Sequence, residues 1–215
     1  MRILITGAHP DDIEAQMGGT IAKHTAQGDY VLLLHAFPPF QDSDSQAIPG
    51  AYENRIKETY RAADVLGAET QFLNVDPYQI RFDRYLVQKL DKFVRRFKPD
   101  TVYTCWDHDS HQDHVNMSLS TLAVARKNNF DVYMYEQVIP GGIMPYGFVR
   151  NMYVELNDEQ MVKKLSSVAC YKSQVALFPG WLEAIEGRAR LRGFEINTKY
   201  AEAFCVVKQV KKNNF

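Results

Sequence analysis

Short apolar runs alternate with longer amphipathic stretches through the first two thirds of the chain. The apolar runs predict strands over residues 2–6, 30–36, 70–74, 101–105 and 132–136. The amphipathic stretches predict helices over residues 17–27, 51–66, 82–97 and 115–127. Strands that alternate with helices form βαβ units with right-handed crossovers, so the pattern indicates an α/β fold with an open, mainly parallel sheet.

The last third of the chain has a different pattern. It predicts a glycine-rich loop at 140–147, strands at 150–155 and 203–207, a helix from 158 to about 171, and a helix at 182–191. Asp158 is the expected N-cap of the first of these helices. No linker divides the 215 residues, so we expect one domain, with a core over about 1–136 and a C-terminal extension over about 137–215. The extension is expected to cover the active-site end.

Composition limits the class of protein, its partners and its cellular compartment. Hydrophobic residues make up 46% of the chain and charged residues 24%, as in ordinary soluble domains. The net charge of −1 argues against a nucleic-acid partner and against a broad anionic-membrane surface. About six apolar residues precede Gly7, too few for a signal peptide or stable membrane insertion. Three cysteines among apolar neighbours predict buried thiols in a reducing compartment, so we expect a cytoplasmic protein.

Two clusters of acids and imidazoles follow predicted strands. His9 lies in the first, with Asp11 and Asp12, and three of the six histidines lie in the second, between residues 108 and 114. If the strand order is 3-2-1-4, the first and fourth strands are neighbours, and their carboxyl ends flank the crevice where such sheets bind ligands. The clusters would then supply three ligands and a general base to one divalent metal, a composition typical of hydrolytic zinc sites.

Each feature also has an ordinary interpretation. A single histidine after a strand is usually structural, and acids after Pro10 often form a turn. A His-x-x-His pair often marks two exposed side chains. We interpret His24 and His35 as structural, and we exclude His108 because a fourth imidazole would close the open metal position.

The sequence resembles a known family at these residues. His9-Pro10-Asp11-Asp12, followed by Gly18-Gly19-Thr20, and the segment 109–114 resemble the two signatures of the LmbE-like (PIG-L) zinc de-N-acetylases. Further similar blocks are 55–58, 62–63, 66–67, 171–174, 192–193 and 200–204, so the resemblance spans nearly the whole chain. Tyr171 departs from the pattern, because relatives often have histidine before Lys-Ser-Gln.

The resemblance implies a Rossmann-like core and a division of roles. His9, Asp12 and His114 would bind one zinc ion per chain, although other divalent ions also suit such donors. Asp11 would be the general base toward a water that the ion activates. His111 would be protonated and would stabilise the oxyanion or donate to the departing amine.

Three more residues receive supporting roles. Asp109 and Asp113 are candidates for orienting an imidazole through its second ring nitrogen. Arg55 would bind substrate hydroxyls or a phosphate through its planar guanidinium. The alternative for Arg55 is an ordinary surface charge paired with Glu53 or Glu58.

The implied reaction is hydrolysis of an acetamide on a small-molecule N-acetylhexosamine, which yields acetate and a free amine. The loop at 37–50 is long enough to be a lid on the substrate side, and aromatic surfaces for a sugar are candidates at 38–40, Tyr78, Trp106, Tyr146 and Trp181. Two alternatives stay open: a zinc amidase for a non-sugar amide, and an inactive metal- or sugar-binding module. A homo-oligomer is compatible with the sequence, which does not select the substrate, the pathway or the native metal.

Overall fold

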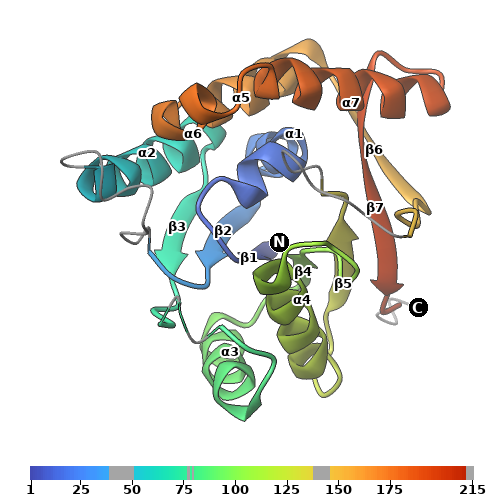
Figure 1. Cartoon of the computed structure of the whole chain (residues 1–215). Helices are drawn as coiled ribbons and strands as arrows, with labels where there is room; N and C mark the ends of the chain where they lie inside the picture. Colours follow the sequence, from blue (N-terminus) through green and yellow to red (C-terminus); the bar gives the residue numbers. More distant parts are fainter. Residues whose placement is uncertain (39–50, 77, 79, 138–145, 212–215) are drawn as a thin grey trace.

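The computed structural model describes residues 1–38, 51–76, 78, 80–137 and 146–211. In this part of the chain, one sheet has the strands β1 (Arg2–Gly7), β2 (Tyr30–His35), β3 (Glu69–Phe72), β4 (Thr101–Thr104), β5 (Asp131–Tyr135), β6 (Met152–Leu156) and β7 (Tyr200–Lys208). The helices are α1 (Asp12–Ala26), α2 (Ala51–Leu66), α3 (Arg84–Phe97), α4 (Gln112–Ala125), α5 (Asp158–Val168), α6 (Lys172–Leu177) and α7 (Trp181–Glu195) (Figure 1).

The strand order is β3-β2-β1-β4-β5-β7-β6. Strands β1 to β5 pair in parallel, and β7 runs antiparallel to both β5 and β6. The expected α/β fold with a mainly parallel sheet is therefore confirmed, including the order 3-2-1-4. Because β1 and β4 are parallel neighbours, the loops that follow Gly7 and Thr104 leave the same edge of the sheet.

Helices cover both faces of the sheet (Figure 1). On one face, Leu4 and Val102 belong to a buried cluster with Met117 of α4 and with apolar residues of α3. On the other face, Ile5 packs with Ile21 of α1 and with apolar residues of α2. The helices α5, α6 and α7 form an outer layer over α1 and α2 (Figure 1), where Ala15 joins a third buried cluster. The helix α1 therefore lies between the sheet and the C-terminal helices.

Both helices that follow the acid–imidazole clusters begin earlier than predicted. The helix expected at 17–27 begins at Asp12, and the helix expected at 115–127 begins at Gln112. Acidic residues stand in both first turns, where the positive end of the helix dipole stabilises them. The sequence interpretation placed these acids before the two predicted helices. The first turns of the two helices therefore carry Asp12 and His114, and Asp11 and His111 are the N-caps of these helices.

The C-terminal elements also differ in detail. Asn157, not Asp158, is the N-cap of α5, since its side chain and that of Gln160 form a reciprocal capping box. That helix ends at Val168 and is followed by the short α6, which the apolar pattern did not predict. Of the three cysteines only Cys105 is buried, so the expectation of three buried thiols was wrong.

Parts of two predicted loops, 39–50 and 138–145, lie outside the described residues. Among the helices that the structure describes, none combines the length and apolar character needed to cross a membrane.

Candidate metal and catalytic site

The two acid–imidazole clusters meet at the ends of β1 and β4. Asp12 Oδ2 lies 3.2 Å from His9 Nδ1, Asp12 Oδ1 lies 3.1 Å from His114 Nε2, and the two ring nitrogens are 3.2 Å apart. Donor atoms around a tetrahedral zinc ion, at 2.0–2.1 Å from it, stand about 3.3 Å from one another. The donor types and their spacing therefore fit one small divalent ion.

Backbone geometry fixes Asp12 in this cluster. It occupies the first turn of α1, and its Oδ2 accepts a hydrogen bond of 2.8 Å from the backbone N–H of His9. His114 occupies the first turn of α4, which enters the site from the other strand. Both residues are buried, so water does not compete strongly for their polar atoms.

Each of the two imidazoles has a carboxylate at its second nitrogen. Asp113 Oδ2 lies 3.2 Å from His9 Nε2, and Asp109 Oδ2 lies 2.6 Å from His114 Nδ1. Gln137, directly after β5, places its side-chain amide 2.7 Å from the same His114 nitrogen. The two carboxylates fix the orientation of the imidazoles and raise their basicity as ligands. Sequence reasoning missed Gln137, because a lone glutamine after a strand has no distinguishing pattern.

Burial and neighbouring charges shift the pKa values of the three donor residues in opposite directions. Burial disfavours the charged imidazoles, but the carboxylate of Asp12 outweighs it and raises the pKa of His9 to about 9 and that of His114 to about 10. Burial likewise disfavours the Asp12 carboxylate, yet the two imidazoles hold its pKa well below the ordinary value. In the metal-free protein, the protonated imidazoles of His9 and His114 neutralise the Asp12 carboxylate. A bound cation would neutralise it in their place.

Metal binding should therefore release protons. Ligands must be deprotonated to bind a metal, and His9 and His114 both hold a proton at pH 7 because their pKa values are raised above it. We expect about two protons released per ion at pH 7, and an affinity that falls as the pH drops below about 10 and more steeply below about 9. Calorimetric titration of zinc into metal-free protein, in buffers of different ionisation enthalpy, measures this number. Release of no protons at pH 7 would contradict the ligand set.

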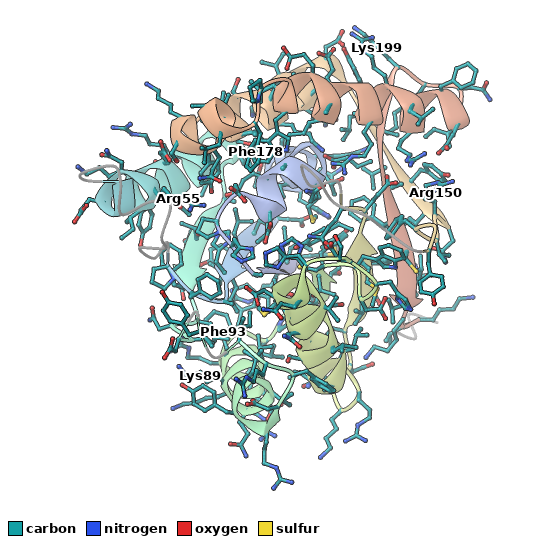
Figure 2. The ribbon with its side chains drawn as sticks, viewed as in Figure 1. Arg55, Lys89, Phe93, Arg150, Phe178 and Lys199 are labelled. Carbon is teal, nitrogen blue, oxygen red and sulfur yellow. The ribbon has the colours of Figure 1, made fainter. Side chains whose placement is uncertain are left out.

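Asp11 has an unusual backbone conformation. It is the N-cap of α1 with φ 103° and ψ −30°, a left-handed region that residues other than glycine rarely adopt. Its Oδ2 lies 3.7 Å from the Arg55 guanidinium of α2, a helix visible with that side chain in Figure 2. Burial and the charge of Asp12 raise the pKa of Asp11 to about 7, although Arg55 opposes the shift. Strained residues with such a pKa are frequent at catalytic sites.

His111 stacks on His114 with ring centroids 4.5 Å apart. The backbone N–H of Asp113 donates to its Nδ1, so the neutral ring would carry its proton on Nε2. Burial, together with the charges of His9 and His114, lowers the pKa of His111. The metal-free site thus favours a neutral His111, in contrast to the protonated state that the resemblance implied. One ring nitrogen of His111 also lies within 4.8 Å of ligand atoms of His9 and His114.

The other three histidines lie outside this cluster of ligand atoms. His35 donates a hydrogen bond from Nδ1 to the backbone carbonyl of His9. Burial lowers the pKa of His35 to about 4, so it stabilises the loop at His9 as a neutral ring. His24 bonds to Asp29 and Tyr103. His108 pairs with Asp107, and its side chain is 53% exposed.

The predicted aromatic residues and a buried pair, Tyr171 and Glu14, are the last features to be placed relative to the candidate site. Trp106 and Trp181 are buried in clusters of apolar side chains, while Tyr78 and Tyr146 are exposed. Tyr171 donates a hydrogen bond of 2.8 Å to Glu14, one turn along α1 from Asp11. Burial raises the pKa of Glu14 to about 7 despite this hydrogen bond. The apolar helix pattern did not indicate Glu14, because an acid between Ile13 and Ala15 suggests a solvent-facing position.

Known proteins share the sequence pattern and the fold. A family model described as PIG-L, GlcNAc-PI de-N-acetylase, matches residues 4–125. An uncharacterised deacetylase of Escherichia coli, YaiS, is 25% identical over 178 residues, or 80% of this chain and 90% of the relative. The diacetylchitobiose deacetylase of Thermococcus kodakarensis is 26% identical over 189 residues, or 80% of this chain and 70% of the relative.

A solved structure with the same fold has a different activity. The 4-carboxy-2-hydroxymuconate hydratase of Pseudomonas putida superimposes with a TM-score of 0.79 and 21% identity, covering 100% of this chain and 99% of the hydratase. The fold is therefore shared by proteins with different reactions, and the side chains at the strand ends must decide between them.

Proposed function

Since the chain belongs to the PIG-L family of de-N-acetylases, we propose that it hydrolyses the acetamide of a small molecule containing an N-acetylhexosamine. The products are acetate and a free amine. The observation that carries the proposal is the group of His9, Asp12 and His114, with mutual donor distances of 3.1–3.2 Å, beside the strained Asp11. These residues lie where the two family signatures of the sequence meet in space.

One zinc ion per chain is the proposed cofactor, held by His9, Asp12 and His114. Two imidazoles and one carboxylate are donors that zinc prefers, and three protein ligands leave a position for water and substrate. When bound, the ion would lower the pKa of a water molecule and polarise the acyl oxygen of the substrate. Asp109 and Asp113 would hold the two imidazoles in position from behind.

The protein's own groups would move the protons. Asp11 accepts a proton from the attacking water, whose oxygen bonds to the acetyl carbon, and its pKa near 7 suits a base at neutral pH. His111 donates a hydrogen bond from Nε2 to the developing oxyanion, as a neutral ring can. The C–N bond then breaks, and the proton held by Asp11 passes to the departing nitrogen. Water is consumed, and acetate and amine are formed.

Arg55 has two functions in this proposal. Its guanidinium lies near Asp11, which favours the charged form of that base. The Arg55 Nε atom is buried and has no hydrogen-bond partner among the described residues, so a substrate hydroxyl or phosphate would have a donor there. Neither Glu53 nor Glu58, the partners of the alternative interpretation, forms an ion pair with Arg55 in the described part of the chain.

The substrate class rests on the similarity to deacetylases of N-acetylated sugars. The T. kodakarensis relative acts on diacetylchitobiose, as its name states, and the family description names an N-acetylglucosamine derivative. We therefore propose a small-molecule sugar as the substrate, and no nucleic-acid partner.

A panel of substrates tests the function. The metal-free and zinc-loaded protein is incubated with N-acetylated sugars, N-acetylated non-sugar amines and an unsaturated dicarboxylate, the last as a hydratase probe. We expect free amine only from sugars, and only with metal. Amine from non-sugars would indicate a general amidase, and hydration of the dicarboxylate would indicate a hydratase. Zinc binding without any turnover would indicate a binding module.

The substitution His111→Ala separates the roles open to this residue. If Nε2 stabilises the oxyanion, the variant should retain its metal and lose roughly 10²–10³-fold in catalytic rate, as removal of one such donor typically does. Metal content and turnover are measured together, with His108→Ala as the control from the same loop. Loss of metal would show that His111 is a ligand, and an unchanged rate would show that it only packs against His114.

A further inference from the structure

The helix α1 is interrupted one turn after the candidate metal ligand Asp12. Met17 has non-helical angles, φ −135° and ψ 23°, so the first turn of α1 (Asp12–Gln16) is a separate unit from the rest of the helix. Such a break leaves backbone carbonyls on its first side and backbone N–H groups on its second side without helical partners. In a buried helix these groups must find other partners.

Side chains from three C-terminal elements supply those partners. Glu202 of β7 accepts hydrogen bonds from the N–H groups of Gly19 at 3.0 Å and Thr20 at 2.7 Å. Lys164 of α5 donates to the carbonyl of Gln16 at 3.0 Å and is paired with Glu202. A guanidinium from α7, that of Arg188, donates to the carbonyl of Ala15 at 3.1 Å. The break therefore has an anionic cap on one side and two cations on the other.

The pair of Lys164 and Glu202 is almost completely buried. Their side chains are 1% and 3% exposed. Burial lowers the pKa of Lys164 to about 8, although Glu202 opposes the shift, so the amine is still mainly charged at pH 7. Removal of one partner from such a pair leaves an uncompensated buried charge, whereas removal of both charges is far less harmful.

The two glycines of the family signature make room for this pair. A Cβ atom at Gly18 would lie 3.1 Å from Lys164 Cγ. A Cβ atom at Gly19 would lie 2.3 Å from Leu156 and 3.2 Å from Glu202 Oε1. A side chain at either position would force Lys164, Leu156 or Glu202 to shift, and this close packing accounts for Gly18-Gly19 without a contact to substrate.

We propose that Lys164 and Glu202 are positioning residues that fix the first turn of α1 and thereby hold Asp11 and Asp12 in register with His114. One end of this turn is set by the contacts of Asp12 with the two imidazoles, and the other end by Lys164 and Arg188. Within the described residues, neither Lys164 nor Glu202 forms a hydrogen bond or ion pair with a candidate metal ligand. The expected effect on catalysis rests on the proposed function. The positioning of the first turn of α1 by these residues does not depend on the substrate.

The test compares two variants of the full chain with the wild type. Lys164→Met by itself would leave the Glu202 carboxylate buried without its cationic partner. The main variant is therefore the double substitution Lys164→Met/Glu202→Gln, which removes both charges and keeps similar side-chain volumes. Lys163→Met is the matched control, because Lys163 is adjacent on α5 but pairs with the exposed Glu159. Four readouts are taken: zinc affinity, the visible spectrum of the cobalt-substituted protein, kcat against KM, and hydrogen exchange of amides 11–20.

In the double variant we expect zinc affinity to fall roughly 10–100-fold, as when partners behind metal ligands are removed. The cobalt spectrum should change, kcat should fall with KM little altered, and amides 11–20 should exchange faster. Lys163→Met should match the wild type throughout. Wild-type affinity, spectrum and exchange in the double variant would overturn the proposal. If the wild type deacetylates no substrate, the proposed function fails, while the affinity, spectrum and exchange still decide the positioning role.

Discussion

Replacement of Asp12 by alanine is expected to remove both the metal and the activity. The Asp12 carboxylate contacts His9 and His114 at 3.2 and 3.1 Å and is the negative charge that the two imidazoles share. Without it, two neutral donors remain, and the loss in zinc affinity should exceed the roughly 10–100-fold cost of losing a partner behind a ligand. Elemental analysis of purified protein, with turnover measured on the same sample, checks this result.

Asp107→Ala is the matched control for Asp12→Ala. Asp107 is a carboxylate beside the same site, but it pairs with the exposed His108 and contacts none of the three candidate ligands in the described residues. The control should keep one metal ion per chain. If Asp12→Ala retained as much metal as Asp107→Ala, Asp12 would not be a ligand.

The second large effect is expected from Asp11→Asn. The amide cannot accept the proton of water, so turnover should fall roughly 10²–10⁴-fold, the range that general-base catalysis contributes. Metal content should stay at the wild-type level, because Asp11 is directed to Arg55 rather than to the three donors. Asparagine suits the test, since it tolerates the left-handed conformation of Asp11 better than alanine does.

The pH dependence gives a second measurement of Asp11. Its pKa is raised to about 7 in the metal-free protein by burial and by Asp12, so the base is protonated below that pH and ionised above it. A bound cation would favour the carboxylate, which moves the pKa lower. Wild-type activity should therefore rise with pH along an acid limb at or below about pH 7, and Asp11→Asn should lose that limb. A loss of metal in Asp11→Asn as large as in Asp12→Ala would overturn the assignment, because Asp11 would then also be a metal ligand.

The strand order of the first half could be predicted because the pattern is local. The runs that became β1 and β2 are buried after their first residue and mostly apolar, and β4 (TVYT) is buried and entirely β-branched or aromatic, so each is recognisable as a strand, and βαβ chirality then leaves few arrangements. The position of His9 and Asp12 opposite His111 and His114 follows from that order. Their contacts follow only from the structure.

Helix starts at the site could not be predicted in the same way. Asp12 is buried and helical because the imidazole of His114, 105 residues after His9, neutralises it. The residues near Asp12 in the sequence do not indicate that His114 will contact it. The acidic residues there suggest a solvent-exposed turn instead. Similarly, the interruption at Met17 depends on Lys164 and Glu202, which are distant in sequence. The contacts that join the two clusters have partners far apart along the chain, whereas the contacts of His9 with Asp12 and of His114 with Asp109 are local.

The separation of His9 from His114 along the chain has a consequence for folding. The candidate metal site forms only after β1 has paired with β4, a long-range event whose loop-closure entropy must be offset before any ligand geometry is present. The unfolded chain offers scattered imidazoles and carboxylates, so it binds the ion much more weakly than the native state. Free zinc at a hundredfold excess over its dissociation constant would then add about 2.7 kcal/mol to the free energy of unfolding. Metal supply would thus change the free energy of unfolding of the protein as well as its turnover.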